Sequence, residues 1–321
     1  MICIVLLVLM GYQLWTKSNH FQNFEIQSWR QCGLYILIVL FLMPVNWLLE
    51  TLKWHSFLSV HTKVSFSKAF RAVTGGIALS LFTPNRIGEY GGRLLFMPYS
   101  IRWPVVFSTL MGSISQNIVA FTSGIVAFML LFNQMLYFKI IGILLLIISG
   151  FCFFKIKNLA LWIARRNLPK SIRKFTWQLG HLEDYKTGLL LRSLLISLAR
   201  YLVYTFQFVL LLIGFEPEAS VIHLFLGVSS LYLFQTLVPM PPVADVLART
   251  NIALILWSGS GMSELSISLA SFIVWVINLL IPAVLGSLAI GAFAPKKSFI
   301  THDAHFSPSY EPVVSDQSQG G

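Results

Sequence analysis

The chain has 321 residues, of which 56% are hydrophobic and 11% charged, and its formal net charge is +11 at pH 7. This composition excludes an ordinary soluble domain, which could not keep so much apolar surface away from water. It does not indicate nucleic-acid binding either, because the basic residues lie in short segments beside apolar runs, where they face anionic lipid headgroups. We therefore predict an integral membrane protein with no nucleic-acid partner.

Long apolar runs recur along the chain, and a run of about 20 residues is enough to cross a bilayer as a helix. We predict six transmembrane helices, at about 1–15, 31–50, 105–132, 135–154, 188–213 and 264–292. The first run is short for a span and carries no cleavable signal peptide. It either crosses a locally thin bilayer or belongs to a helix that begins before Met1.

Loop charges predict how these helices are oriented. The basic segment 155–174 is expected on the cytoplasmic side, and the acidic loop 214–218 is expected outside. Other basic residues mark a second cytoplasmic stretch: Lys53, Lys63, Lys68 and Arg71. Lys296 and Lys297 place the C-terminus in the cytoplasm, where the polar tail 293–321 is predicted to be disordered. The predicted location is the inner (plasma) membrane.

Two further apolar segments begin and end on one side of the membrane by this count. Segment 72–82 is cytoplasmic at both ends and would turn back at 84–92, whereas segment 221–259 is external at both ends and would turn at 238–245. We predict two re-entrant helical hairpins, whose irregular turns need protein or water as hydrogen-bond partners. The alternative is that Pro and Gly only kink ordinary helices, which would give eight spans.

The order of span, span, hairpin and span occurs twice, in halves of about 1–132 and 135–292 that enter the membrane from opposite faces. The predicted fold is therefore an all-α polytopic membrane protein of about six transmembrane helices plus two re-entrant hairpins in an inverted repeat, which together form one transmembrane domain over 1–292. Broken segments at matching positions of inverted halves indicate where a transporter binds its substrate.

The first hairpin turn contains three charged residues, Arg86, Glu89 and Arg93. A charge at bilayer depth costs roughly 2.5–3.5 kcal/mol, so these side chains need partners or a function. A guanidinium binds phosphate through two parallel hydrogen bonds, and a carboxylate keeps it paired when the site is empty. We predict Arg86 as the phosphate ligand, Glu89 as its counter-ion and Arg93 as the cation that first meets the substrate. A purely structural ion pair is the alternative.

The second hairpin offers Asp245 and Arg249, which are four residues apart and suited to pairing on one helix face. They are predicted to bind another part of a headgroup, and a self-satisfied pair is the alternative. Arg200 lies near the middle of a predicted span and is expected to pair with Glu89, Asp245 or a ligand.

Small and rigid residues are predicted to shape the two turns: Pro84, Gly88, Gly91, Gly92, Pro239, Pro241 and Pro242. Cys3, Cys32 and Cys152 lie in apolar stretches without the Cys or His spacing of a metal site. They are interpreted as packing residues, and neither a metal nor a cofactor is predicted.

The run Pro84-Asn85-Arg86-Ile87-Gly88-Glu89 resembles the Pro-x-Arg-Leu-Gly-Glu signature of the lysylphosphatidylglycerol synthase/flippase transmembrane-region family. The similarity extends over about residues 1–292 and includes Arg200 with Tyr201 and Gln207. At the second turn many relatives have Pro-Gly-Gly-Leu-Gly-x-x-Glu, whereas this chain has Pro-Pro-Val-Ala-Asp from position 241. In the synthases an aminoacyltransferase domain follows the membrane region, and here only a polar tail follows.

The resemblance implies flippase-like movement of a phospholipid or lipid-linked headgroup between leaflets, with membrane lipids that carry anionic or phosphate groups as partners. No Asp-x-Asp, Gly-x-Ser-x-Gly or phosphate-loop motif indicates an enzyme. Two alternatives stay open: a membrane-embedded transferase that acts on a lipid-linked substrate, and an ion-coupled transporter of a small anion. The oligomeric state also stays open, with a homo-oligomer among the alternatives.

Overall fold

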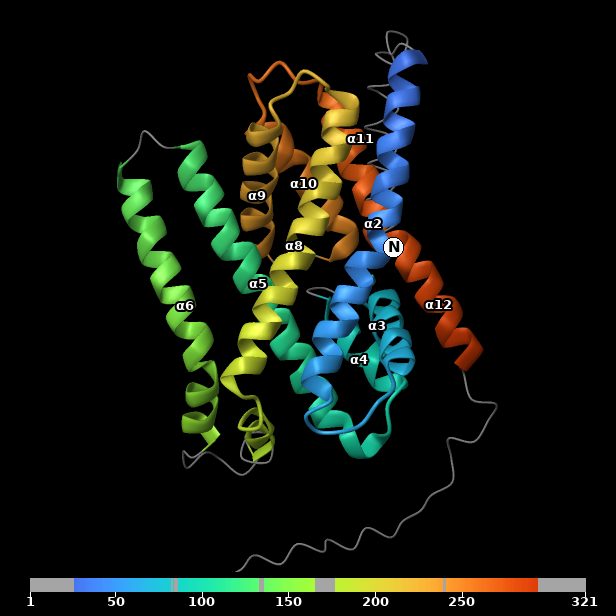
Figure 1. Ribbon diagram of the computed structural model, residues 1–321, viewed down its shortest axis with the longest axis vertical. Helices are drawn as coiled ribbons and strands as arrows, with labels where there is room; N and C mark the ends of the chain where they lie inside the picture. The colour runs from blue at the N-terminus through green and yellow to red at the C-terminus, as the bar shows by residue number, and fades with distance from the viewer. Residues whose placement is uncertain are drawn as a thin grey trace, which may run out of the picture.

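The structure is a computed structural model that describes residues 26–81, 83, 86–132, 136–164, 177–238 and 241–293. Within these ranges the regular elements are all helices, packed as an elongated bundle (Figure 1). The predicted all-α class is therefore confirmed. The predicted span 1–15 and nearly all of the tail 293–321 lie outside the described residues.

Five helical segments in the described part of the chain are long and apolar enough to cross a membrane. Three of them belong to single helices: α2 (Ile26–Leu58), α6 (Leu136–Ala164) and α8 (Thr187–Phe215). A fourth joins the short 3-10 helix η3 (Tyr99–Ile101) to α5 (Arg102–Leu131). The fifth joins α11 (Glu264–Trp275), the single π-helical turn η5 (Val276–Leu280) and α12 (Ile281–Phe293). They correspond to the five predicted spans from 31–50 onward.

The helix α2 is longer than its predicted span. It continues past residue 50 to Leu58, and the side chain of Lys53 is 1% exposed inside the bundle. The prediction that Lys53 belongs to a cytoplasmic loop is therefore wrong. Glu50 lies one turn earlier on the same helix and makes an ion pair with Lys53 at 2.8 Å, so the charge is neutralised where it is buried.

Two pairs of shorter helices complete the bundle. In the first pair α3 (Phe66–Ser80) packs against α4 (Gly88–Leu95), and in the second α9 (Val221–Leu237) packs against α10 (Pro242–Leu256). The 15 residues of α3 span only about 22 Å, less than the roughly 30 Å of a hydrocarbon core. Figure 1 shows the first pair in the lower half of the bundle and the second in the upper half.

Glycine residues allow α4 to lie directly against α3. A Cβ atom on Gly92 would come within 2.5 Å of the carbonyl oxygen of Gly75, and one on Gly88 would overlap the carbonyl of Leu79. Gly91 differs, because a Cβ there would meet nothing within 4 Å. Gly88 and Gly92 are therefore needed for close backbone contact.

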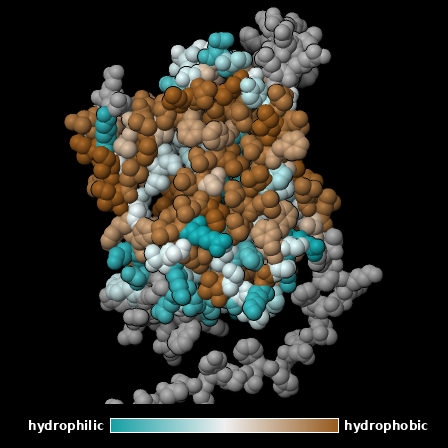
Figure 2. All heavy atoms as spheres, in the orientation of Figure 1, coloured by the Kyte–Doolittle hydropathy of each residue, from teal (hydrophilic) through white to brown (hydrophobic). Residues whose placement is uncertain are grey.

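The surface of the bundle is apolar around its middle. Figure 2 shows a broad hydrophobic band on the visible face, with hydrophilic residues concentrated at its two ends. The helix α6 contributes many outward-facing residues, among them Ile140, Ile147 and Phe151, each 60% exposed or more. Such a band matches the hydrocarbon core of a bilayer, and the protein is a multi-pass membrane protein.

Candidate functional site

A cavity of about 280 Å³ lies inside the bundle. It is lined by the turn between α3 and α4, by the pair α9 and α10, and by the long helices around them. Its lining includes Arg86 before α4, Arg200 on α8, and Asp245 with Arg249 on α10. Four of the six predicted site residues therefore line one space, although they are far apart in the sequence. The other two, Glu89 and Arg93, are not among the lining residues.

Glu50 is the central carboxylate beside this cavity, and three cations contact it. Its Oε2 lies 2.8 Å from Nζ of Lys53 and 3.0 Å from Nη1 of Arg200, and its Oε1 lies 2.9 Å from Nη2 of Arg93. The Glu50 side chain is only 9% exposed. A buried carboxylate in this position ties α2 to α4 and α8.

Glu89 extends the ion-pair network to the first hairpin turn. Its Oε2 lies 3.0 Å from Nη2 of Arg93, and its Oε1 lies 3.3 Å from Nε of Arg86. With the contacts of Glu50, the network contains four cations and two carboxylates, which leaves an excess of two positive charges. Lys53, Arg93 and Arg200 are the buried cations of the network, and positive charge kept away from water needs compensation.

Arg86 has an unusual backbone conformation. Its φ angle is 56°, in the left-handed region that side chains other than glycine rarely adopt, and it is alone in this among the described non-glycine residues. The hydroxyl of Thr83 accepts a hydrogen bond of 2.7 Å from the Gly88 amide across the same turn. The turn leaves the Arg86 side chain 46% exposed at the cavity while its Nε contacts Glu89. Such backbone strain is found most often at functional sites.

Arg93 lies deeper than predicted. Its side chain is 1% exposed, and its guanidinium carbon Cζ lies 5.4 Å from the centroid of the Trp54 ring. Two of its nitrogens, Nε and Nη1, have no hydrogen-bond partner in the described part of the chain. Because the two carboxylates and the indole ring enclose it, Arg93 does not stand where a substrate would first arrive. It instead joins the two carboxylates of the network, because its Nη2 contacts both Glu50 and Glu89.

A chain of amide side chains orients Arg200. Its Nε donates to Asn46 at 2.7 Å, and Asn46 in turn donates to Asn278 at 3.1 Å. Asn278 donates to Gln207, which donates to a backbone carbonyl of α2. Asn278 lies in the π-helical turn η5, and such turns are frequent at functional sites. Arg200 therefore pairs with Glu50, and not with Glu89 or Asp245, and is held at the cavity wall.

The second short-helix pair supplies a smaller charged group. Asp245 accepts a bond of 2.9 Å from Nη2 of Arg249 and another of 2.6 Å from Gln235. Nε of Arg249 is buried and has no hydrogen-bond partner in the described residues. Pro241 caps α10 and Pro242 begins it, a position where proline favours a helix start. The predicted turn residues Pro84 and Pro239 lie outside the described residues.

Residues 2–286 match a protein family described as the lysylphosphatidylglycerol synthase TM region. The chain belongs to this family. Comparison with curated proteins and with solved structures gave no match. Membership in the lysylphosphatidylglycerol synthase TM family indicates a role related to membrane lipids, and the match covers nearly the whole helical bundle.

Sequence reasoning missed three site residues of this family member: Asn46, Glu50 and Lys53. They follow one another at spacings of four and three residues, which places them on one face of α2. Polar residues at helical spacing inside an apolar segment were a usable signal. The predicted span ended at residue 50, at the first charged residue, and so separated Glu50 from its partner Lys53.

Replacing Glu50 by Gln should destabilise the protein strongly, because Lys53, Arg93 and Arg200 would lose their shared carboxylate. An unpaired buried charge typically costs about 3–5 kcal/mol. We expect a clearly lower midpoint of thermal unfolding in detergent, with part of the loss restored by added anionic phospholipid. The matched control is Glu218→Gln at an exposed site near the far end of the bundle. An unchanged midpoint for Glu50→Gln would contradict the central role of this carboxylate.

Proposed function

We propose that this protein moves a phospholipid with an anionic, phosphate-bearing headgroup between the leaflets of the inner (plasma) membrane. The observation that carries this proposal is the charge of the cavity wall: three arginines and one aspartate line a space of about 280 Å³ within an apolar bundle. Membership in a lipid-related membrane family supports the same class of substrate.

Phosphate suits this wall better than another ligand of similar size. Guanidinium groups bind phosphate through parallel, charge-assisted hydrogen bonds. Arg86 and Arg200 approach the cavity from different elements, and both are already tied to carboxylates that fix their direction. The excess of two positive charges in the network is what a bound phosphate would offset. Asp245 and the amide groups then remain for the polar part of the headgroup.

The two short-helix pairs would form the path. We propose that α3–α4 and α9–α10 are re-entrant hairpins that enter from opposite faces and meet at the cavity, in an inverted repeat of two halves. Their short helices and their places in opposite halves of the bundle support this (Figure 1). Motion of one half against the other would open the cavity to each leaflet in turn. We assign the end that carries Lys63 to the cytoplasm, and with it the C-terminus.

The substitution Arg86→Lys tests phosphate binding, because it keeps the charge and removes the fork of two hydrogen-bond donors. We expect about tenfold slower lipid exchange or worse, since a hydrogen bond to a charged group contributes about 1.5–3 kcal/mol. The measurement is exchange of fluorescent phosphatidylglycerol between leaflets of liposomes that contain the purified protein. Arg192→Lys, at an exposed position on α8, is the matched control and should exchange lipid normally.

The same liposomes separate the other functions. Wild-type exchange by Arg86→Lys would contradict the role of Arg86 in phosphate binding. Loss of folding in that variant would instead assign Arg86 to a structural ion pair. Chemical conversion of the labelled lipid would identify a transferase, and uptake of soluble phosphate driven by an ion gradient would identify a small-anion transporter.

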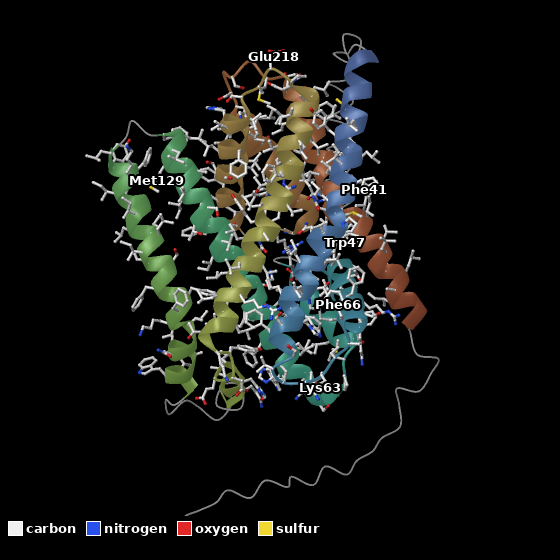
Figure 3. All side chains as sticks on the ribbon, in the orientation of Figure 1. Phe41, Trp47, Lys63, Phe66, Met129 and Glu218 are labelled. Carbon is white, nitrogen blue, oxygen red and sulfur yellow. The ribbon has the colours of Figure 1, made fainter. Side chains whose placement is uncertain are left out.

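Cysteine accessibility tests the re-entrant topology. In a chain whose own cysteines have been replaced, single cysteines at Lys63 and Ser100 flank the α3–α4 pair and should react from one face of the membrane. A cysteine at Glu218 should react from the other face, because Figure 3 places Lys63 and Glu218 at opposite ends of the bundle. All three positions are exposed. Labelling of positions 63 and 100 from opposite faces would contradict the first hairpin.

A further inference from the structure

A second polar cluster lies apart from the cavity and consists of His61, His181 and Asp184. His61 follows the end of α2, His181 belongs to the short 3-10 helix η4 (Trp177–Leu182), and Asp184 lies in the turn before α8. Each residue offers one ligand atom, and these three atoms lie within 4.8 Å of one another. None of the three lines the cavity, so the proposed lipid site does not explain the cluster.

His61 has a nitrogen that no neighbour satisfies. Its side chain is 8% exposed, with Nδ1 at 3.4 Å from the Oδ2 atom of Asp184. Nε2 is buried and has no hydrogen-bond partner among the described residues. A neutral imidazole carries one proton, so one of its nitrogens always needs either a donor or a metal ion. The carboxylate of Asp184 is an acceptor and cannot fill that need.

Two neighbouring rings hold the imidazole of His61 in position. The rings of His181 and Tyr185 pack edge-on against it, with centroids 5.4 Å and 5.3 Å away, which fixes its place in the cluster.

We propose that His61, His181 and Asp184 bind a divalent transition-metal ion, with Zn²⁺ as the best fit. Two imidazoles and one carboxylate form a recurrent zinc ligand set that leaves a fourth position for water. With metal–ligand bonds of about 2.0–2.2 Å, tetrahedral ligand atoms are about 3.3–3.5 Å apart. The ligand atoms of the three residues lie within 4.8 Å of one another, so rotation of the side chains is enough to bring them to this separation. Asp184 is 55% exposed, so its side chain is free to adjust and the ion can be reached from solvent.

The bound ion would fasten the end of α2 to the segment that leads into α8. These two helices come from the two predicted halves of the protein, and η4 lies beside the lower end of the bundle (Figure 1). A metal that binds only the folded chain stabilises it by mass action. The ion would join these two segments whether or not the protein moves lipid.

The test uses the purified full-length protein, without a polyhistidine tag and stripped of metal by a chelator. We expect one Zn²⁺ per chain in equilibrium dialysis, a higher midpoint of thermal unfolding with Zn²⁺, and a Co²⁺ visible spectrum typical of a four-coordinate nitrogen and oxygen site. His61→Ala and His181→Ala should lose the ion, and Asp184→Asn should weaken binding by about tenfold or more.

His223→Ala is the matched control, since His223 is exposed and lies beside the acidic loop at the other end of the bundle. It should bind Zn²⁺ as the wild type does. Asp184→Asn changes an exposed side chain and so keeps the test valid if either histidine variant fails to fold. The proposal would be overturned if the wild type bound neither Zn²⁺ nor Co²⁺. It would also be overturned if Asp184→Asn and either single histidine variant both bound the ion with wild-type affinity.

Discussion

Glu50 lies where α2, α4 and α8 meet, and its two oxygens contact Lys53, Arg93 and Arg200 at 2.8–3.0 Å. Charges removed from water are tolerated only when they are paired, so these contacts decide which helices can approach one another in the polar interior. Glu50 also fixes the direction of Arg200, whose Nε is held by Asn46 and whose guanidinium reaches the cavity wall. The proposed substrate site thus lies at the edge of an ion-pair network that also holds α2, α4 and α8 together.

The close contact of α3 with α4 connects this network to the hairpin turn. Glycines at positions 75, 76, 88 and 92 bring the two backbones together, and a Cβ atom on Gly76 would lie 3.1 Å from Cγ of Arg93. Arg93 is therefore clamped between α3, Trp54 and the two carboxylates. Glu89, on the same helix turn, is then placed to hold Arg86 at the cavity. The glycines at the contact of α3 with α4 therefore help to position the charged residues of the site.

Sequence patterns predicted the spans after residue 30 closely, because length and hydropathy determine which helices can cross a membrane. The pairings of Arg86 with Glu89 and of Asp245 with Arg249 followed from spacings of three and four residues. The pairing of Arg200 with Glu50 could not be predicted from spacing. Glu50 is 150 residues away in the sequence, and only the packing of α2 against α8 brings the two side chains together. Lys53 was misplaced although its partner is close in the sequence. The predicted span ended at Glu50, whereas α2 continues and Glu50 neutralises Lys53 one turn later. The cluster of His61, His181 and Asp184 likewise depends on contacts that no local motif encodes.

The most direct test of the account is an experimental density map of the protein in nanodiscs of phosphatidylglycerol, with a bound antibody fragment to aid alignment. Proposed binding of a phosphate headgroup by Arg86 and Arg200 predicts headgroup density in the cavity, within hydrogen-bond distance of both guanidinium groups. The same map in nanodiscs of an uncharged lipid should lack that density. A cavity that holds only water in phosphatidylglycerol, with headgroups confined to the two ends of the bundle, would contradict the central claim.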